Sequence, residues 1–231
     1  LIALEWGRWL AYDKQYVLEV SGHNKVSSIN TGLENAGIDE LLNAFSEKLI
    51  LYQDANYAKS YLKIMDPITA QFGDNIISQK SAKALFRAMA IKDEYEVARL
   101  MLSPTFGQTL KSKFGNSRPS SYYLAPPFLS FLKDANGFPK KVRFGSWVRT
   151  VFWVLTKLKS LRGTAFDPFA HSRERKLEVS FRAALIAKLS NPKKLMQMPE
   201  KSEAQLDAAL KVKGYGHVKQ KSLEAAILAL N

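Results

Sequence analysis

Apolar residues recur along most of this chain at the three- and four-residue steps of an amphipathic helix. The pattern predicts four helices in the first half: over residues 1–20, from Asp39 to about Phe72, over residues 78–102 and over residues 105–113. Asp66-Pro67 is expected to kink or end the second helix, because proline lacks the amide donor and clashes with the preceding turn. Pro104 is expected to bound the third.

The second half shows the same pattern with more interruptions. Further helices are predicted at about residues 146–160, 172–189, 202–210 and 218–230, and loops at residues 21–37 and 163–169. Ser172 is a favourable N-cap, and Asn191-Pro192 should end the helix that Ser172 begins. Asn136-Gly137 favours a tight turn, so Phe128–Leu132 and Lys141–Phe144 are predicted to pair as a short hairpin. The expected fold is therefore mainly α: an irregular multi-helix domain with long loops and one short β-hairpin.

Charge is distributed unevenly along the 231 residues, whose net charge is +13. Residues 1–101 contain 11 Lys or Arg and 13 Asp or Glu, so the other 23 basic and 8 acidic residues lie beyond them. The chain therefore divides into a near-neutral helical half, residues 1–102, and a strongly basic half, residues 103–231, within one continuous domain. Such asymmetry favours an acidic or polyanionic partner, or a solvated surface that faces an acidic neighbouring domain.

Composition excludes several classes of site. The chain has no cysteine, which excludes a disulfide framework, a cysteine-held iron–sulfur cluster and a thiolate zinc site, and fits a cytoplasmic location. No stretch approaches 18 uninterrupted apolar residues, so no membrane span is expected. The chain begins without Met and without the basic region of a signal peptide, and we expect it to be a fragment of a longer protein.

The first candidate site is the segment from Arg162 to Arg175, in which a glycine loop leads into a predicted helix. Backbone donors and the helix dipole favour an anion at such a helix start. Arg162, Arg173 and Arg175 are therefore candidates to bind a carboxylate, a phosphate or an acidic partner. In the alternative interpretation the segment is a structural corner, where Asp167 caps backbone donors and Arg162 pairs with Asp167 or Glu174.

The second candidate site is the turn Gly214-Tyr-Gly-His-Val-Lys219. Its glycines allow a close approach to another surface, and His217 is placed to act as a base or donor. Lys213 and Lys219 flank this turn and complete the anion- or partner-binding candidates. In the alternative interpretation the turn is a glycine helix cap with a packed Tyr215 and a surface histidine.

The remaining patterns predict neither catalytic residues nor a metal site. The three histidines lack the spacing of a zinc helix, and no phosphate-binding loop, dinucleotide fingerprint or nucleophile elbow occurs. Basic and aromatic residues interleave over residues 140–159, as they do in proteins that bind single-stranded nucleic acid. The aromatic residues there fit the buried face of a helix better, so nucleic acid is not the preferred partner.

Several segments, taken in order, resemble one known family: the C-terminal region of the large, fused indolepyruvate ferredoxin oxidoreductases of bacteria. The segments that carry the resemblance are Tyr52–Tyr57, Lys92–Arg99, Leu124–Pro127, Phe144–Trp147, Leu161–Thr164, Asp167–Phe169 and Gly214–Lys219. Each motif is weak alone, and their shared order is the more specific signal. The chain departs from the family at Ala170, where the family usually has Gly, and at Lys213, where it often has Arg.

This resemblance implies a parent enzyme that binds thiamine diphosphate and iron–sulfur clusters and oxidatively decarboxylates aryl 2-oxo acids to acyl-CoA, with ferredoxin as acceptor. Those cofactor sites belong to upstream catalytic domains, which would be the partners of this chain, together with ferredoxin and CoA. The chain itself is then expected to be an accessory domain with no cofactor or catalytic residue of its own. The alternative is a freestanding basic helical module that binds nucleic acid or another polyanion.

Overall fold

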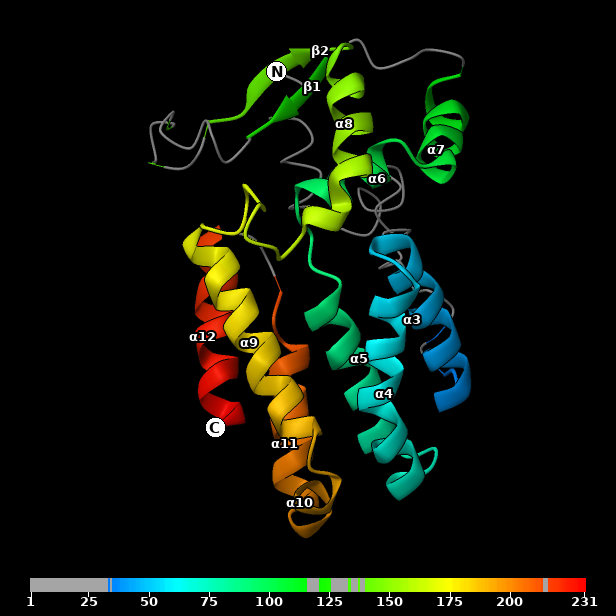
Figure 1. The fold of residues 1–231 in the computed structure, drawn as a ribbon, viewed down its shortest axis with the longest axis vertical. Helices are drawn as coiled ribbons and strands as arrows, with labels where there is room; N and C mark the ends of the chain where they lie inside the picture. The colour runs from blue at the N-terminus through cyan, green and yellow to red at the C-terminus, as the bar shows by residue number, and fades with distance from the viewer. Residues whose placement is uncertain are drawn as a thin grey trace, which may run out of the picture.

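The computed structural model describes residues 33, 35–115, 121–125, 133, 137, 140–213 and 216–231. The helix predicted over residues 1–20, and most of the loop predicted after it, lie outside the described residues. The helices and strands of the described part, shown in Figure 1, are α3 (Ile38–Tyr52), α4 (Ala55–Phe72), α5 (Ile76–Met89), α6 (Glu94–Met101), α7 (Pro104–Phe114), β1 (Ser121–Leu124), β2 (Val142–Gly145), α8 (Val148–Lys157), the 3-10 helix η3 (Leu158–Leu161), α9 (Arg173–Leu189), α10 (Pro192–Gln197), α11 (Pro199–Leu210) and α12 (Gly216–Leu230). The expected mainly α fold is confirmed.

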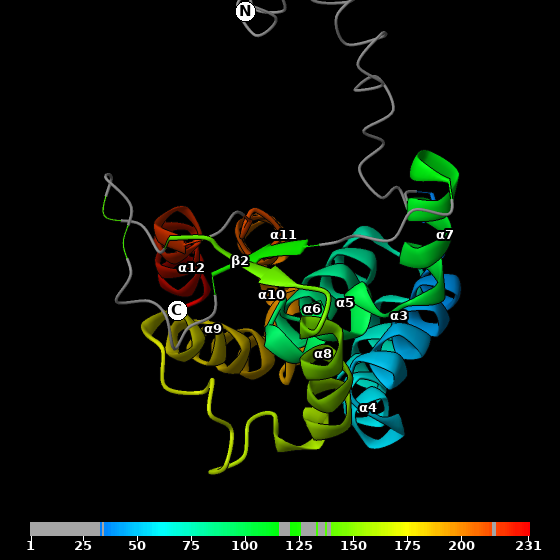
Figure 2. The ribbon, with the colours of Figure 1, turned by 90° about the horizontal axis from the view of Figure 1, so that it is seen from above.

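These elements form two groups, which we call the bundle and the small unit. The bundle contains α3, α4, α5 and α9 to α12, and the small unit contains α6, α7, α8, η3 and the two strands, which lie above it in Figure 1. Figure 2 shows α9 and α12 on one side of the bundle and α3 and α4 on the other, with α5 and α11 between them. The bundle therefore combines helices from before residue 90 with helices from after residue 172.

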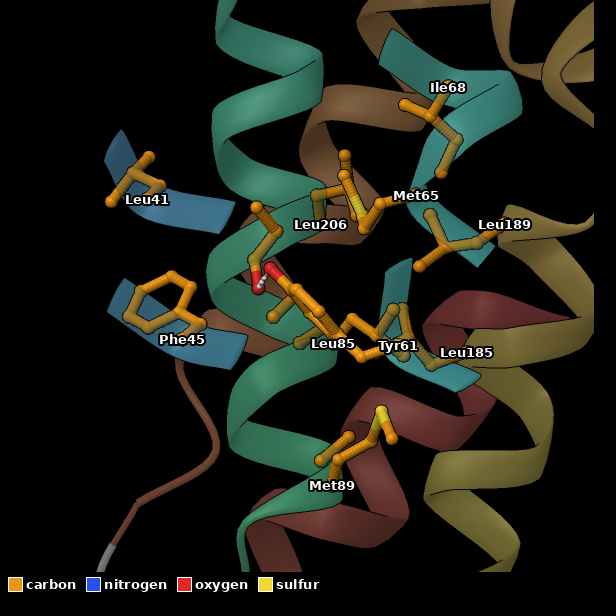
Figure 3. Close-up of a cluster of buried hydrophobic side chains, with 14 of the residues drawn as sticks. Leu41, Phe45, Tyr61, Met65, Ile68, Leu85, Met89, Leu185, Leu189 and Leu206 are labelled. Carbon is orange, nitrogen blue, oxygen red and sulfur yellow. Dashed lines mark hydrogen bonds between the residues drawn. The ribbon is translucent and has the colours of Figure 1, made fainter. Parts of the chain in front are cut away.

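The core of the bundle is made by side chains from both of these stretches, as Figure 3 shows. Leu41, Leu85, Leu185 and Leu189 are fully buried there. Tyr61 is also fully buried, and its hydroxyl donates to the carbonyl of Ala82 over 3.2 Å, so the polar atom is satisfied inside the core. The near-neutral and basic halves of the sequence consequently share one hydrophobic core.

Two predicted helices of the first half are each divided in two by an aspartate. Asp54 separates α3 from α4, and its side chain accepts a hydrogen bond from the amide of Tyr57 over 2.8 Å. Asp93 separates α5 from α6 and accepts from the amide of Glu96 over 2.8 Å. The single helices predicted from Asp39 and over residues 78–102 are therefore wrong, because an N-cap aspartate begins a new helix at each position.

Prolines have a weaker effect on the helices than expected. Pro67 lies inside α4, which continues to Phe72 although one amide donor is missing. Met65 and Ile68, on either side of Pro67, are fully buried, so core packing outweighs the lost hydrogen bond. Pro104 does not merely bound a helix but occupies the first turn of α7, where its missing donor costs nothing.

The two strands pair antiparallel, with Tyr122 opposite Phe144. The second predicted strand is confirmed by β2, which pairs with β1, and the predicted partner Phe128–Leu132 lies outside the described residues. Tyr122 is buried and meets the ring of Phe152 edge to face at 5.5 Å. This contact packs β1 against α8.

The later helices agree more closely with the pattern. Ser172 caps α9 by accepting from the amide of Arg175 over 3.1 Å, and α9 ends at Leu189 as predicted. The short helix α10 was not predicted, although Asn191 caps it and Pro192 occupies its first turn. No helix in the described part of the chain combines the length and apolar character needed to cross a membrane.

Candidate functional site

A buried ion pair joins the loop after η3 to the start of α6. Asp93, the N-cap of α6, has a side chain that is only 1% exposed, and the side chain of Arg162 is 9% exposed. The Nε of Arg162 donates to one carboxylate oxygen of Asp93 over 2.5 Å, and its Nη2 donates to the other over 3.0 Å. The guanidinium thus binds the carboxylate with two parallel hydrogen bonds, the strongest arrangement for such a pair.

The same arginine also holds the end of α3. Its Nη1 donates to the carbonyl of Tyr52 over 2.8 Å and to the side-chain oxygen of Gln53 over 2.6 Å. The guanidinium carbon lies 3.7 Å from the centre of the Tyr52 ring, a cation–π contact. Burial alone would lower the pKa of Arg162, but the hydrogen bond to Asp93 and the electrostatic interactions with Tyr52, Asp93 and Glu96 together outweigh burial, so its pKa is raised. Arg162 therefore stays charged and fixes α3 to α6.

A second arginine continues the network into α9. Arg175 has a side chain that is 12% exposed, and its Nη1 lies 3.3 Å from a carboxylate oxygen of Glu178 and 3.9 Å from Asp93. Its Nη2 lies 3.6 Å from Glu94. That oxygen of Glu94 and the Nη1 of Arg175 are both buried without a hydrogen-bond partner. The interactions of the Arg175 side chain with Glu94 and Glu178 are therefore electrostatic.

Lys219 extends the network to α12. It forms a direct ion pair with Glu178, whose side chain is 6% exposed, and lies 4.0 Å from Glu174. Burial raises the pKa of Glu174, and Lys219 opposes that rise. Burial likewise raises the pKa of Glu94, against the opposing effect of Arg175. We call Asp93, Arg162, Arg175, Glu178 and Lys219 the junction network, because they join the small unit to both sides of the bundle.

Asp167 forms a separate corner beside this network. Its side chain accepts from the amides of Gly163 and Phe169, over 2.9 and 3.0 Å, and from the hydroxyl of Tyr95 over 3.2 Å. Gly163 has a φ of 74°, which a side chain would strain. Tyr95 also meets the ring of Phe169 edge to face at 5.3 Å. Asp167 therefore caps backbone donors, as the alternative interpretation of this segment held, whereas Arg162 pairs with Asp93 and not with Asp167 or Glu174.

The sequence-derived candidates fall in different surroundings. Arg162, Arg175 and Lys219 come together in the junction network. Arg173 is 78% exposed and lies 3.4 Å from Glu224, and Lys213 is exposed. The side chain of His217 lies outside the described residues.

The sequence patterns missed the acidic members of the network. Glu174 and Glu178 lie one helix turn apart, a spacing typical of an exposed charged face, but Glu178 is buried. Asp93 lies in a stretch whose charges have the ordinary spacing of ion pairs along a helix. The spacing Asp93-x-x-Glu96 is a helix-start signature and could have revealed the cap. Nothing in the local sequence indicates that the arginine bound by Asp93 lies 69 residues away.

Five of the segments that carry the family resemblance contribute to this region. Tyr52–Tyr57 contributes Tyr52 and Gln53, and Lys92–Arg99 contributes Asp93 and Tyr95. The other three segments contribute Arg162 and Gly163, then Asp167 and Phe169, and finally Lys219. Segments spread over some 170 positions thus meet at one place. There they pair buried charges and cap backbone donors. These contacts connect the small unit to the bundle.

No three His, Cys, Asp or Glu side chains of the described ranges are grouped so that they could hold a metal ion. In comparisons with known proteins, the model of a family of unknown function (DUF6537) matches residues 38–230. No match to the chain was found among the curated proteins or among the solved structures.

Proposed function

We propose a function for this chain from the order of its motifs, since the family to which the chain belongs has no known function; the family model covers all but the first 37 residues and the last one. The chain is an accessory, non-catalytic helical domain of an indolepyruvate ferredoxin oxidoreductase. Thiamine diphosphate and the iron–sulfur clusters are bound by upstream catalytic domains of the same polypeptide, in the cytoplasm. The reaction performed there is oxidative decarboxylation of an aryl 2-oxo acid to an acyl-CoA.

The observation that carries the proposal is the convergence of the resembling segments on one buried region. Segments that only shared composition with the family would have no reason to meet in space. Here Tyr52, Asp93, Arg162 and Lys219 take part in one connected set of contacts. The positive charges of this set pair with buried carboxylates and not with solvent. Such pairing suits a domain whose charged residues maintain its fold and take no part in catalysis.

Within this proposal, the outward-facing cations supply electrostatic attraction. Arg173 and Lys213 are the members of the candidate set whose side chains are exposed. They are placed to attract an acidic ferredoxin or the phosphates of CoA by long-range steering, which raises association rates and weakens with salt. Arg162, Arg175 and Lys219 contribute less to this field, because each lies against a buried carboxylate.

The test uses the complete reading frame that contains this chain. The encoded protein, purified without oxygen, is expected to contain iron and thiamine diphosphate and to reduce ferredoxin when supplied with indolepyruvate and CoA. The isolated 231-residue chain is expected to do neither. A complete protein that lacks both cofactors, or an isolated chain that turns over the substrate, would refute the proposal.

Steering is tested in the same enzyme by reversing charges. Arg173→Glu with Lys213→Glu is expected to reduce the salt dependence of the ferredoxin or CoA kcat/KM. The matched control is Lys59→Glu with Lys63→Glu, an equal charge change at exposed positions of α4. If the two pairs change the salt dependence equally, the attraction comes from net charge and not from Arg173 and Lys213.

A further inference from the structure

Helix α8 has one face that is packed inside the small unit. Val148 and Phe152 are buried there, and Leu155 is half-buried beside them. They pack against Tyr122 of β1 and Ala98 of α6. The core of the small unit therefore accounts for these apolar positions of α8.

A second apolar face of α8 is exposed. Trp147, Val151, Val154 and Leu158 follow one another at steps of four, three and four residues and are 60%, 41%, 41% and 41% exposed. This spacing places all four on one side of a helix. We call them the outer stripe. The same spacing forms the seam between two packed helices, in which residues of one helix fit between residues of the other.

Trp147, the first residue of the outer stripe, is positioned by contacts within the chain itself. Its ring meets the ring of Phe144 at 5.8 Å in an edge-to-face arrangement. Gly145 leaves room for it, because a side-chain carbon there would lie 3.2 Å from the Trp147 ring. A large aromatic side chain that is exposed yet fixed is typical of the residues that dominate binding energy at protein interfaces.

The segment of the chain that carries the outer stripe is uniformly positive in sequence. Residues 135–166 contain seven Lys or Arg and neither Asp nor Glu. Lys157 lies over the Trp153 ring at 5.7 Å, and Arg149 donates to the Tyr122 hydroxyl over 3.3 Å. Six of these seven take part in none of the ion pairs of the described residues: Lys140, Lys141, Arg143, Arg149, Lys157 and Lys159. We call these six cations the basic rim. Their charge, unlike that of the junction network, is available to a partner.

We propose that the outer stripe and its basic rim dock an acidic amphipathic helix of a partner protein. The stripe spacing matches an apolar helix face, and the rim matches Asp and Glu residues beside that face. A second copy of this chain is a poor occupant, because pairing α8 with itself would bring together two segments that carry the same unbalanced positive charge. The inference goes beyond the accessory role and holds whichever protein carries the chain.

The test measures binding of a labelled synthetic peptide to the full chain by fluorescence anisotropy. The peptide is about 20 residues long, enough for a stable helix, with leucines at the stripe spacing and glutamates beside them. Control peptides carry lysine in place of glutamate, or the same residues in scrambled order. The acidic peptide is expected to bind at about 50 mM salt and to weaken as salt screens the rim. Both controls are expected not to bind.

Variants locate the binding face. Val151→Asp with Val154→Asp is expected to weaken peptide binding at least about tenfold, because it places charge in the apolar seam. The matched control is Val179→Asp with Leu228→Asp, which makes the same charge change at exposed apolar positions of α9 and α12 and should alter binding less than about threefold. Circular dichroism melting checks that both variants fold.

Several outcomes would overturn the proposal. Equal binding by both variants would place the peptide elsewhere. If phosphatidylglycerol vesicles or a labelled single-stranded RNA bind through Val151 and Val154 while the acidic peptide does not, the face recognises lipid or nucleic acid instead. If the peptide binds only after residues 1–32 are deleted, that segment of the same chain occupies the face.

Discussion

Replacing Asp93 by Asn tests whether the junction network holds the two units together. The substitution keeps the shape of the side chain and its ability to cap α6, since asparagine is as good an N-cap as aspartate. It removes the charge that pairs with Arg162, whose side chain is 9% exposed and cannot reach water readily. Removing one partner of a buried ion pair costs about 3–5 kcal/mol. For a domain of this size that loss lowers Tm by about 10 °C.

The assay is urea unfolding of the 231-residue chain followed by circular dichroism, at neutral pH. A double-mutant cycle with Arg162→Met separates the pair from its surroundings. The double variant is expected to lose about 1–3 kcal/mol less than the sum of the two single losses, because neither charge is then left without its partner. The exposed pair Arg173–Glu224, at 3.4 Å, supplies the control. Arg173→Gln should cost less than about 1 kcal/mol.

The outcome that refutes this argument is simple to recognise. If Asp93→Asn unfolds at the same urea concentration as the wild type, or if the two single losses add without coupling, Asp93 and Arg162 do not stabilise each other. Equal losses for Asp93→Asn and Arg173→Gln would also contradict it, since burial is the physical difference between the two pairs.

Three further predictions concern neighbouring groups. Burial raises the pKa of Glu94, so the folded protein holds this proton to a higher pH than the unfolded chain does, and Glu94 loses stabilising effect as pH rises through that window. Glu94→Gln should therefore gain stability relative to the wild type as pH rises above the ordinary value of 4.5 in paired unfolding curves, and a constant difference would contradict the assigned cause. Burial, with Asp167 adding to it, raises the pKa of Tyr95 to about 12, so stability from this hydroxyl is lost as pH rises from the ordinary value of 10.0 through 12. In Asp167→Asn the pKa of Tyr95, followed by NMR of labelled tyrosine rings, should move down toward the ordinary value, and an unchanged pKa would show that burial acts alone. Leu185 is fully buried in the bundle core, so Leu185→Ala should cost about 2–5 kcal/mol in the urea assay, and a loss below about 1 kcal/mol would mean that the core is looser than described.

Local signals predicted those parts of the fold that depend on neighbouring residues. Ser172 and Leu189 mark the ends of α9 because a serine cap and an Asn-Pro break act within one or two turns. The mainly α class follows from apolar spacing for the same reason. The division at Asp54 was missed because the apolar pattern continues past it, and periodicity carries no information about which polar residue will cap a helix.

The same local signals could not predict the junction network. A single sequence shows that Arg162 is basic and near a glycine, which fits an exposed anion site as well as a buried pair. Which applies depends on whether the folded chain brings a carboxylate to it, and Asp93 comes close to Arg162 only when α6 packs against α8. The outer stripe was missed for another reason: the aromatic residues of 140–159, Trp147 among them, were assigned to a buried face, but the small unit is too small to cover both sides of α8.

The bundle has a consequence for how the protein is made. Its first three helices end at Met89, and the helix that completes their core begins at Arg173, so roughly 80 residues must be synthesised in between. At the usual speed of translation this interval lasts about 4–17 seconds. During that time Leu41, Tyr61 and Leu85 have no partner from α9, and the emerging chain presents an uncovered apolar face beside the ribosome. The order of elements along the chain thus leaves apolar surface of the kind that promotes aggregation exposed until α9 is made.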